Sequence, residues 1–560
     1  YRTTRAERRL YGIIYKSLVF PDGKENSFSN SESRFYEHNL ELIGSYNKRF
    51  GDFTFDANFG GNILYWNSRD SSRSTSLGLT TEDAFSLANS VGPVQRGGTF
   101  LSRKKVLSAF AKATVGYKDF IYLDMSARQD FSSVLPSNAN GYFYPSLGTS
   151  FVFTQFLNNS IPALSFGKLR ASWAQIGTDA LGPFAINQTY TSTIAPNMYN
   201  NFPLTSFPNV VVDPNLLPTL NSSFEVGADF RFYRDRIGLS VTYFNEKKTN
   251  DIVTTSVSGA SGVSAKTFNV GRVQRQGLEV EINATPVKTR NFSWDITLNW
   301  SRVNSMVQKV SDQQQFVTIA DRAGATGDQF GHVTLMAIEG QQWGQLRGRA
   351  IRRINGVPVI GADGLFLFDQ NVALGSILPN YNGGMFNQFR YKNFTLSASV
   401  DYQNGGKFFS MSHIGSLNTG LLDVTAATND NGMNVRDPLA DGGGVHVHGV
   451  TEDGKPVSRY VEAYDYFKQF SAYEGQTIAE AAVFDASYIK VREISLGYNF
   501  NFKNPKAFVK RLFVSGVARN PFRPWTTNPG FDPTELSRSW GENGQLPGTR
   551  SYGINLRVSF

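Results

Sequence analysis

The stretch DFTFDANFGGNI, residues 52–63, carries the pattern that decides the fold. Its odd-numbered positions hold Phe, Phe, Ala, Phe, Gly and Ile, and its even-numbered positions hold Asp, Thr, Asp, Asn, Gly and Asn. Successive side chains of a β-strand point to opposite faces of the sheet, so a period of two separates the two sets. The stretch is therefore predicted to be a strand with one apolar and one polar side.

The same alternation recurs at residues 292–300 and 394–403. A soluble β-sandwich also alternates, so strand length has to decide between the two architectures. These runs reach about ten residues, whereas five or six are usual in globular sheets. About ten tilted residues cross the hydrocarbon core of a bilayer. The length therefore favours a membrane barrel, in which the apolar side meets lipid.

The connections between strands are of two kinds. Residues 117–120, 233–236 and 391–394 combine an aromatic residue with Lys or Arg and with Asp or Asn, and each separates two alternating runs, as in a tight hairpin. Long connections are expected near 66–103, 176–221, 305–382 and 405–484. Short turns at one rim and long extracellular loops at the other are typical of outer-membrane barrels.

These patterns predict an all-β fold, a transmembrane antiparallel β-barrel with about sixteen strands in this chain. The strands are expected near 8–20, 35–48, 52–64, 105–117, 120–131, 143–155, 166–176, 223–233, 236–248, 277–286, 292–303, 384–391, 394–404, 487–500, 511–519 and 550–560.

The composition agrees with this architecture. Phe 45, Tyr 24 and Trp 7 supply aromatic girdles, and Gly 52 supplies turns. No run of 18 or more apolar residues predicts a membrane-spanning helix. The absence of cysteine excludes disulfides, thiolate metal sites and a cysteine nucleophile. The net charge of +9 is spread along the chain, so we expect no nucleic-acid partner.

The last expected strand alternates apolar and polar residues up to a final phenylalanine. An aromatic strand of this kind resembles the signal read by the outer-membrane barrel assembly machinery. We therefore predict that machinery as a partner, with lipid or lipopolysaccharide around the barrel. The predicted membrane-assembly signal consists of Tyr552, Ile554, Leu556, Val558 and Phe560.

A series of motifs occurs in a fixed order along the chain. It comprises KVLSAF at 105–110, SARQD at 126–130, GYFYPS at 141–146, DPNL at 213–216, NVG at 269–271, QGLEVE at 276–281 and GFDP at 530–533. Their content and order resemble the SusC/RagA family of TonB-linked outer-membrane proteins of Bacteroidota. One departure is Pro218-Thr219, where the family usually has Pro-Glu.

The resemblance implies a 22-stranded barrel with an N-terminal plug and a TonB-contacting segment. It also implies a multi-pass protein of the Gram-negative outer membrane that works with a SusD-like surface lipoprotein and the TonB complex. The sequence begins with Tyr1 rather than Met, and a protein of this kind must be exported. We therefore expect residues 1–560 to be the C-terminal portion of one barrel, with the plug and first strands encoded upstream.

Inward-facing polar residues are expected to line the barrel lumen, among them Glu279, Glu281, Asp295 and Asn299. Paired carboxylates such as Glu279 and Glu281 are interpreted as lumen lining rather than as an acid–base pair. The sequence does not predict which residues contact a ligand.

Few residues of the sequence stand in patterns that are typical of catalytic, metal or phosphate sites. His446 and His448 share one face of any extended segment, but no third ligand stands at a defining spacing, so a loop surface is favoured over a metal site. Residues 429–432, NDNG, resemble part of a calcium loop but lack its distal acidic ligand, which favours a plain turn. Residues 442–444, GGG, lack the Lys-Ser/Thr of a phosphate loop. We predict no catalytic residue, cofactor or metal, and no enzyme.

Three functions are consistent with these patterns and with the family resemblance. The leading one is TonB-dependent import of glycans or peptides together with a SusD-like lipoprotein. A SusC-like barrel acting as a structural or scaffold subunit of a larger envelope assembly is the second, and a passive porin is the third.

Overall fold

In the computed structural model, sixteen strands form one antiparallel ladder in chain order, here called the wall. The structure describes all residues except 1, 11–25, 82, 98–99, 158–160, 200–201, 258, 312–313, 322–332, 471–477, 503–507, 529 and 543. The wall consists of β1 (Arg2–Leu10), β2 (Ser27–Phe50), β3 (Phe53–Ser74), β5 (Phe100–Tyr117), β6 (Ile121–Ser132), β7 (Gly141–Phe151), β8 (Leu164–Thr178), β12 (Thr219–Phe232), β13 (Ile237–Ser256), β14 (Ala265–Lys288), β15 (Phe292–Lys309), β22 (Pro379–Tyr391), β23 (Phe394–Gly405), β28 (Tyr488–Asn501), β29 (Arg511–Thr526) and β31 (Ser551–Ser559).

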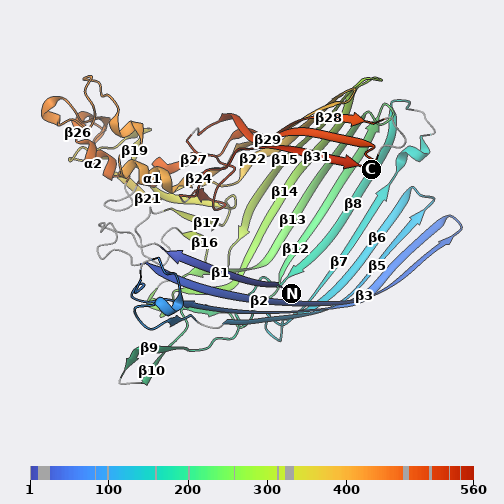
Figure 1. The fold of residues 1–560 in the computed structure, drawn as a ribbon, viewed down its shortest axis with the longest axis horizontal. Coiled ribbons are helices and arrows are strands. Elements are labelled where there is room, and N and C mark those ends of the chain that lie inside the picture. Colours follow the sequence, from blue (N-terminus) through green and yellow to red (C-terminus); the bar gives the residue numbers. More distant parts are fainter. Residues whose placement is uncertain are drawn as a thin grey trace.

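Each wall strand pairs antiparallel with the next along the ladder. The sheet curls in space, so that β2 and β3 lie across from β28, β29 and β31 in Figure 1. Among the described residues, β1 and β31 form the two edges of the ladder. The predicted antiparallel barrel architecture with about sixteen strands in this chain is confirmed.

The expected strands fall on wall strands, with one correction at an end. The first expected strand, 8–20, lies mostly outside the described residues, and its described part, 8–10, belongs to β1. The sixth was expected to reach 155, but β7 ends at Phe151 and a 3-10 turn follows at Phe153–Phe156.

Several strands run further than the alternation indicated. β3 continues to Ser74 and β5 begins at Phe100, both inside the expected loop 66–103. The added part of β3 reads WNSRDSSRS, which is polar on both faces after Trp66. Alternation is required only where one face meets lipid, so a strand that continues into water keeps its backbone ladder and loses its pattern.

The tight turns depend on left-handed backbone conformations. Lys118 and Asp119 both have positive φ, at 48° and 57°, between β5 and β6. The Phe120 amide donates to the Tyr117 carbonyl at 3.1 Å, so the two residues are the central residues of a β-turn, and positive φ at both matches the twist of the flanking strands. Aromatic pairs lie beside these turns, such as Phe53 with Tyr117, whose ring centres are 4.8 Å apart, and Phe394 with Tyr498 at 4.6 Å. They occupy the place of an interfacial girdle.

The long connections contain packed structure of their own. We call the body formed by residues 333–378, 406–470, 478–486 and 540–542 the loop body; it lies at the upper left of Figure 1. Its elements are β17 (Thr334–Ile338), β18 (Gln345–Ile351), β19 (Arg353–Ile354), β20 (Val357–Pro358), β21 (Phe368–Ser376), β24 (Lys407–Ser410), α1 (Met411–Asn418), η4 (Asp423–Ala426), η5 (Leu439–Asp441), β25 (Val445–Val450), β26 (Pro456–Val461), α2 (Ala463–Lys468), η6 (Ala479–Ala482), β27 (Val483–Asp485) and β30 (Gly541–Glu542).

Smaller elements complete the described chain. They are η1 (Leu87–Asn89), β4 (Gln95–Arg96), η2 (Phe153–Phe156), β9 (Thr191–Tyr199), β10 (Phe202–Ser206), β11 (Val210–Val212), η3 (Gly259–Ser261) and β16 (Phe316–Asp321). None of the helices in the described residues has the length and apolar character needed to span a bilayer.

Candidate lumen-facing binding surface

A polar groove of about 610 Å³ follows the middle of the wall. The pairing of β14 with β15 sets Glu279 opposite Ser301 and Glu281 opposite Asn299. Residues directly opposite in an antiparallel pair share a face, so the three predicted lumen residues Glu279, Glu281 and Asn299 lie together. All three line this groove, as the sequence pattern indicated.

The fourth predicted residue, Asp295, lies on the same face but outside the groove. Its Oδ1 accepts a hydrogen bond from the Thr285 hydroxyl at 2.8 Å, and its Oδ2 lies 3.5 Å from the Arg390 guanidinium. Asp295 is thus part of the polar wall nearer to the tight turns.

Arg170 provides the main positive charge of the groove. Its guanidinium donates to the Thr242 hydroxyl at 2.6 Å and lies 3.5 Å from the Asp229 carboxylate. Gly227 stands opposite Arg170 in the ladder, and a Cβ at this position would lie 2.7 Å from the guanidinium. The missing side chain of Gly227 therefore makes the room in which Arg170 lies across the sheet.

Carboxylates outnumber this cation in the groove. Glu225, Glu279, Glu281 and Asp401 all line it. Asp401 is held by Arg492, whose Nε lies 2.6 Å from Oδ2, while the shielded Oδ1 has no hydrogen-bond partner among the described residues. The groove therefore offers hydrogen-bond acceptors to a ligand that carries hydroxyl, amide N–H or ammonium groups.

A second groove of about 640 Å³ adjoins the first, because Ser301 and Asn382 line both. Glu246 accepts a hydrogen bond from Asn221 Nδ2 at 2.6 Å and lies 3.4 Å from the Arg275 guanidinium. Aromatic side chains join the charged ones here, namely Trp343 and Tyr381. Ligand pockets typically combine flat apolar surfaces with a few placed polar groups, and the two grooves together have this character.

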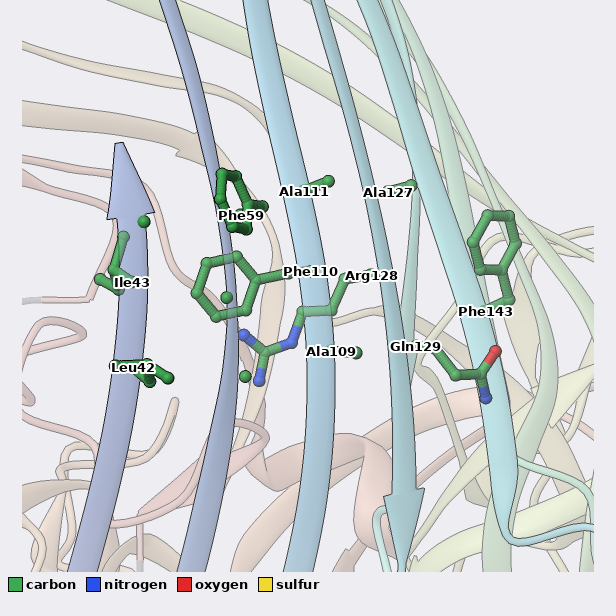
Figure 2. A pocket seen from close by; sticks show the side chains of 13 residues that line it. Leu42, Ile43, Phe59, Ala109, Phe110, Ala111, Ala127, Arg128, Gln129 and Phe143 are labelled. Carbon is green, nitrogen blue, oxygen red and sulfur yellow. The ribbon is translucent and has the colours of Figure 1, made fainter. Parts of the chain in front are cut away.

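A third hollow, of about 670 Å³, lies over β2, β3 and β5–β7. Figure 2 shows Phe59 and Phe143 on either side of Ala109, Ala111 and Ala127. Register places Phe59 opposite Ala111, on the apolar face of the wall. Apart from Arg128 and Gln129, its lining consists of aromatic rings, aliphatic side chains and glycines, which suits lipid chains, so we place the candidate site at the other two grooves.

The strand alternation identified part of this surface but missed other parts. Arg170, Glu225 and Asp401 each sit on the polar face of an alternating run, and that parity was readable in advance. Their meeting in one groove depends on the relative register of strands from β8 to β23, which no single run reveals.

The predicted assembly-signal residues lie along the edge strand β31 and beyond its end. Tyr552, Ile554, Leu556, Val558 and Phe560 are all exposed, and β31 pairs with β29. Their role as an assembly signal stays a prediction. His446 and His448 lie on β25 in the loop body, and neither lines one of the grooves.

Outside the wall, Glu542 of β30 is a buried carboxylate surrounded by hydrogen-bond donors. The hydroxyls of Ser410 and Ser412 donate to it at 2.8 and 2.5 Å, and the Ser412 and Gly544 amides donate as well. Burial opposes ionisation, but these hydrogen bonds outweigh it and lower the pKa of Glu542.

Comparison with known proteins gives a consistent result. The family model described as TonB dependent receptor-like, beta-barrel matches residues 8–426. TonB-dependent receptor P3 of Formosa agariphila is 24% identical over 96% of this chain and 52% of its own length. TonB-dependent receptor SusC of Bacteroides thetaiotaomicron is 22% identical over 86% of this chain and 46% of its own. The chain thus spans about half the length of these curated relatives.

Solved structures agree on the fold. The RagAB peptide transporter superposes with a TM-score of 0.77 at 15% identity, covering 100% of this chain and 58% of that one. The RagAB peptide importer in its closed-closed state gives 0.75 at 16% identity, with the same coverage. The named relatives are receptors and transporters rather than enzymes. The chain therefore belongs to the TonB-dependent receptor β-barrel family and is an outer-membrane barrel of the SusC/RagA type.

Proposed function

We propose that the protein imports glycans or peptides across the outer membrane, driven by the TonB complex and aided by a SusD-like surface lipoprotein. In this proposal, a plug and a TonB-contacting segment come from sequence outside residues 1–560. The long loops are extracellular and meet the lipoprotein.

The observation that carries the proposal is a pair of adjoining grooves on the face of the wall opposite the apolar one, the first polar and the second lined by both polar and apolar side chains. Glycans present rows of hydroxyl groups, and peptides present amide N–H groups. The carboxylates Glu225, Glu279 and Glu281 supply acceptors for both, and Trp343 and Tyr381 supply flat surfaces. A selective binding surface of this kind suits a carrier better than a general pore.

Uptake by cells that produce the full-length protein tests the proposal. Fluorescent oligosaccharide and peptide pools are supplied, with and without a functional TonB complex. We expect uptake of one pool only, and its loss when TonB is absent. Glu281→Gln lowers uptake severalfold because it removes a charged acceptor from the groove. Glu41→Gln, the same change on the polar face of β2 away from the grooves, leaves uptake unchanged.

Other outcomes identify the competing functions. Uptake that persists without TonB and rises in proportion to concentration points to a passive porin. Absence of uptake, combined with co-purification of assembly or secretion machinery instead of a SusD-like lipoprotein, points to a scaffold. Either result contradicts the proposal.

A further inference from the structure

In the loop body, two histidines and an aspartate from separate segments converge. His446 and His448 stand two residues apart on β25, so both project from one face of the β25–β26 hairpin. Asp430 comes from the turn at 429–432. One ligand atom from each of the three lies within 4.8 Å of the other two. The carboxylate that the sequence spacing did not reveal is therefore supplied by the fold.

The turn that carries Asp430 is fixed by its neighbours. The Asn429 side chain donates to the carbonyls of Gly442 and Gly444 at 2.9 and 3.0 Å, and its Oδ1 accepts from the Asn431 and Met433 amides. Because the Asn429 Oδ1 already accepts these two hydrogen bonds, the Asp430 carboxylate is the charged group that this turn presents to the hairpin. Calcium prefers six to eight oxygen ligands, so the calcium-loop resemblance of this segment does not describe its use.

His446 is oriented by a second set of contacts. Its ring stacks on Tyr460, with ring centres 4.2 Å apart and planes 12° apart, and its Nε2 lies 2.9 Å from the Ser458 hydroxyl. Its Nδ1 faces the Asp430 carboxylate. A hydrogen bond at one ring nitrogen fixes the tautomer and frees the other nitrogen as a ligand, which is how metal-binding histidines are usually held.

From these contacts we propose that Asp430, His446 and His448 bind a divalent transition metal, with zinc the best match. Two imidazoles and one carboxylate are a ligand set that zinc accepts, with bonds of about 2.0–2.2 Å. The side chain of Asp430 is 68% exposed, which leaves it free to rotate toward the two rings. The exposed position leaves the fourth coordination site to water or to a group from outside. The metal pins the turn 429–432 to the hairpin, whether or not the protein imports a ligand.

Metal titration of the full-length protein tests the site. The protein is purified in detergent through a tag without histidines, stripped with EDTA and titrated with Zn²⁺ by calorimetry, then with Co²⁺ by visible absorption. We expect one tight site per chain and a tetrahedral Co²⁺ spectrum. His448→Ala and Asp430→Asn each weaken binding by about tenfold or more, since loss of a residue that merely supports a ligand already has an effect of that size. His448 is preferred to His446 as a target because His446 also packs on Tyr460.

Matched variants provide the controls. Asp453→Asn changes a carboxylate at the tip of the same hairpin, and His38→Ala changes an exposed histidine of β2; both leave zinc affinity unchanged. Zinc also slows proteolytic cleavage within residues 429–450 of the wild type and has no such effect in Asp430→Asn. Absence of zinc binding to the wild type overturns the proposal, and so does binding that His448→Ala and Asp430→Asn retain in full.

Discussion

The wall and the loop body of this chain are stabilised in opposite ways. In the wall, large apolar side chains are exposed, such as Leu42 at 80% and Phe59 at 60%. In the loop body, Phe408, Phe409 and Ile414 are at most 1% exposed. The wall has no interior to fill along its lipid face and depends on its backbone ladder and the bilayer. The loop body is folded like a small soluble protein, around apolar side chains that exclude water.

The difference extends to how each part is encoded. A wall strand is encoded locally: its residues alternate between apolar and polar, and it pairs with the wall strands that come before and after it in the chain. The main core cluster of the loop body gathers Val333, Leu346, Phe409, Ala479 and Trp540, which come from five separate stretches of sequence. We therefore expect changes in one part to leave the other part folded.

The largest effect is expected in the core of the loop body. Phe409→Ala leaves a cavity among Leu346, Ile414 and Trp540 and lowers the stability of the loop body by about 3–5 kcal/mol. Faster proteolysis of residues 333–378 and 406–486 measures this loss. The wall keeps its heat-modifiable mobility on gels.

The matched control is Leu421→Ala, which removes an apolar side chain that is 77% exposed. It changes proteolysis little. If Phe409→Ala also abolished barrel mobility, the loop body and the wall would not be independent, and the comparison would fail.

A smaller effect is expected on the lipid face of the wall. Leu298 lies six residues beyond the start of β15 and opposite Ile282 and Met385. Leu298→Arg lowers the stability of the barrel in the membrane by about 2–4 kcal/mol if Leu298, Ile282 and Met385 lie at mid-bilayer. The yield of heat-modifiable barrel in membranes measures the loss.

Two control variants place the same arginine at another depth in the membrane or on the other face of the strand. Leu396→Arg, two residues after the girdle residue Phe394, costs about 0–1 kcal/mol because its charge reaches the interface. Thr297→Arg, on the polar face of the same strand, is tolerated. Equal losses for Leu298→Arg and Thr297→Arg would contradict the assignment of the faces.

The sequence predicted the wall well because the wall is a local pattern. Alternation at 52–63, 292–300 and 394–403 located strands whose centres the structure retains. It failed at their outer ends, since residues such as those at 67–74 pair in the ladder although they present no apolar face. The alternation predicted which polar residues lie on the lumen face, such as Glu279 and Glu281. It did not predict which residues of other strands they meet in the grooves. Asp430 escaped prediction because its approach to His446 depends on the packing of two loop segments.

The smallest effect concerns Glu542, which links β30 to the start of α1 in the loop body. Its carboxylate binds both Ser410 and Ser412, and Ser410 is also the residue that caps α1, accepting from the His413 amide at 3.1 Å. Because folding lowers the pKa of Glu542 below its ordinary value of 4.5, the folded state is favoured by ionisation. This stabilisation is present above pH 4.5 and is lost as the pH falls through the lowered value.

Glu542→Gln should therefore reduce the stability of the loop body at neutral pH by about 1–3 kcal/mol, the range for losing charged hydrogen bonds. Hydrogen exchange of the α1 amides at pH 7 and at pH 4 measures it. The wild type loses protection at the lower pH, and the variant loses less, since it has no proton to gain at this position. Glu452→Gln, at a side chain that is 69% exposed, keeps the wild-type pH dependence. If the protection of the α1 amides in Glu542→Gln depended on pH as it does in the wild type, Glu542 would not stabilise α1. The helix would then be held by apolar contacts alone, like the core around Phe409.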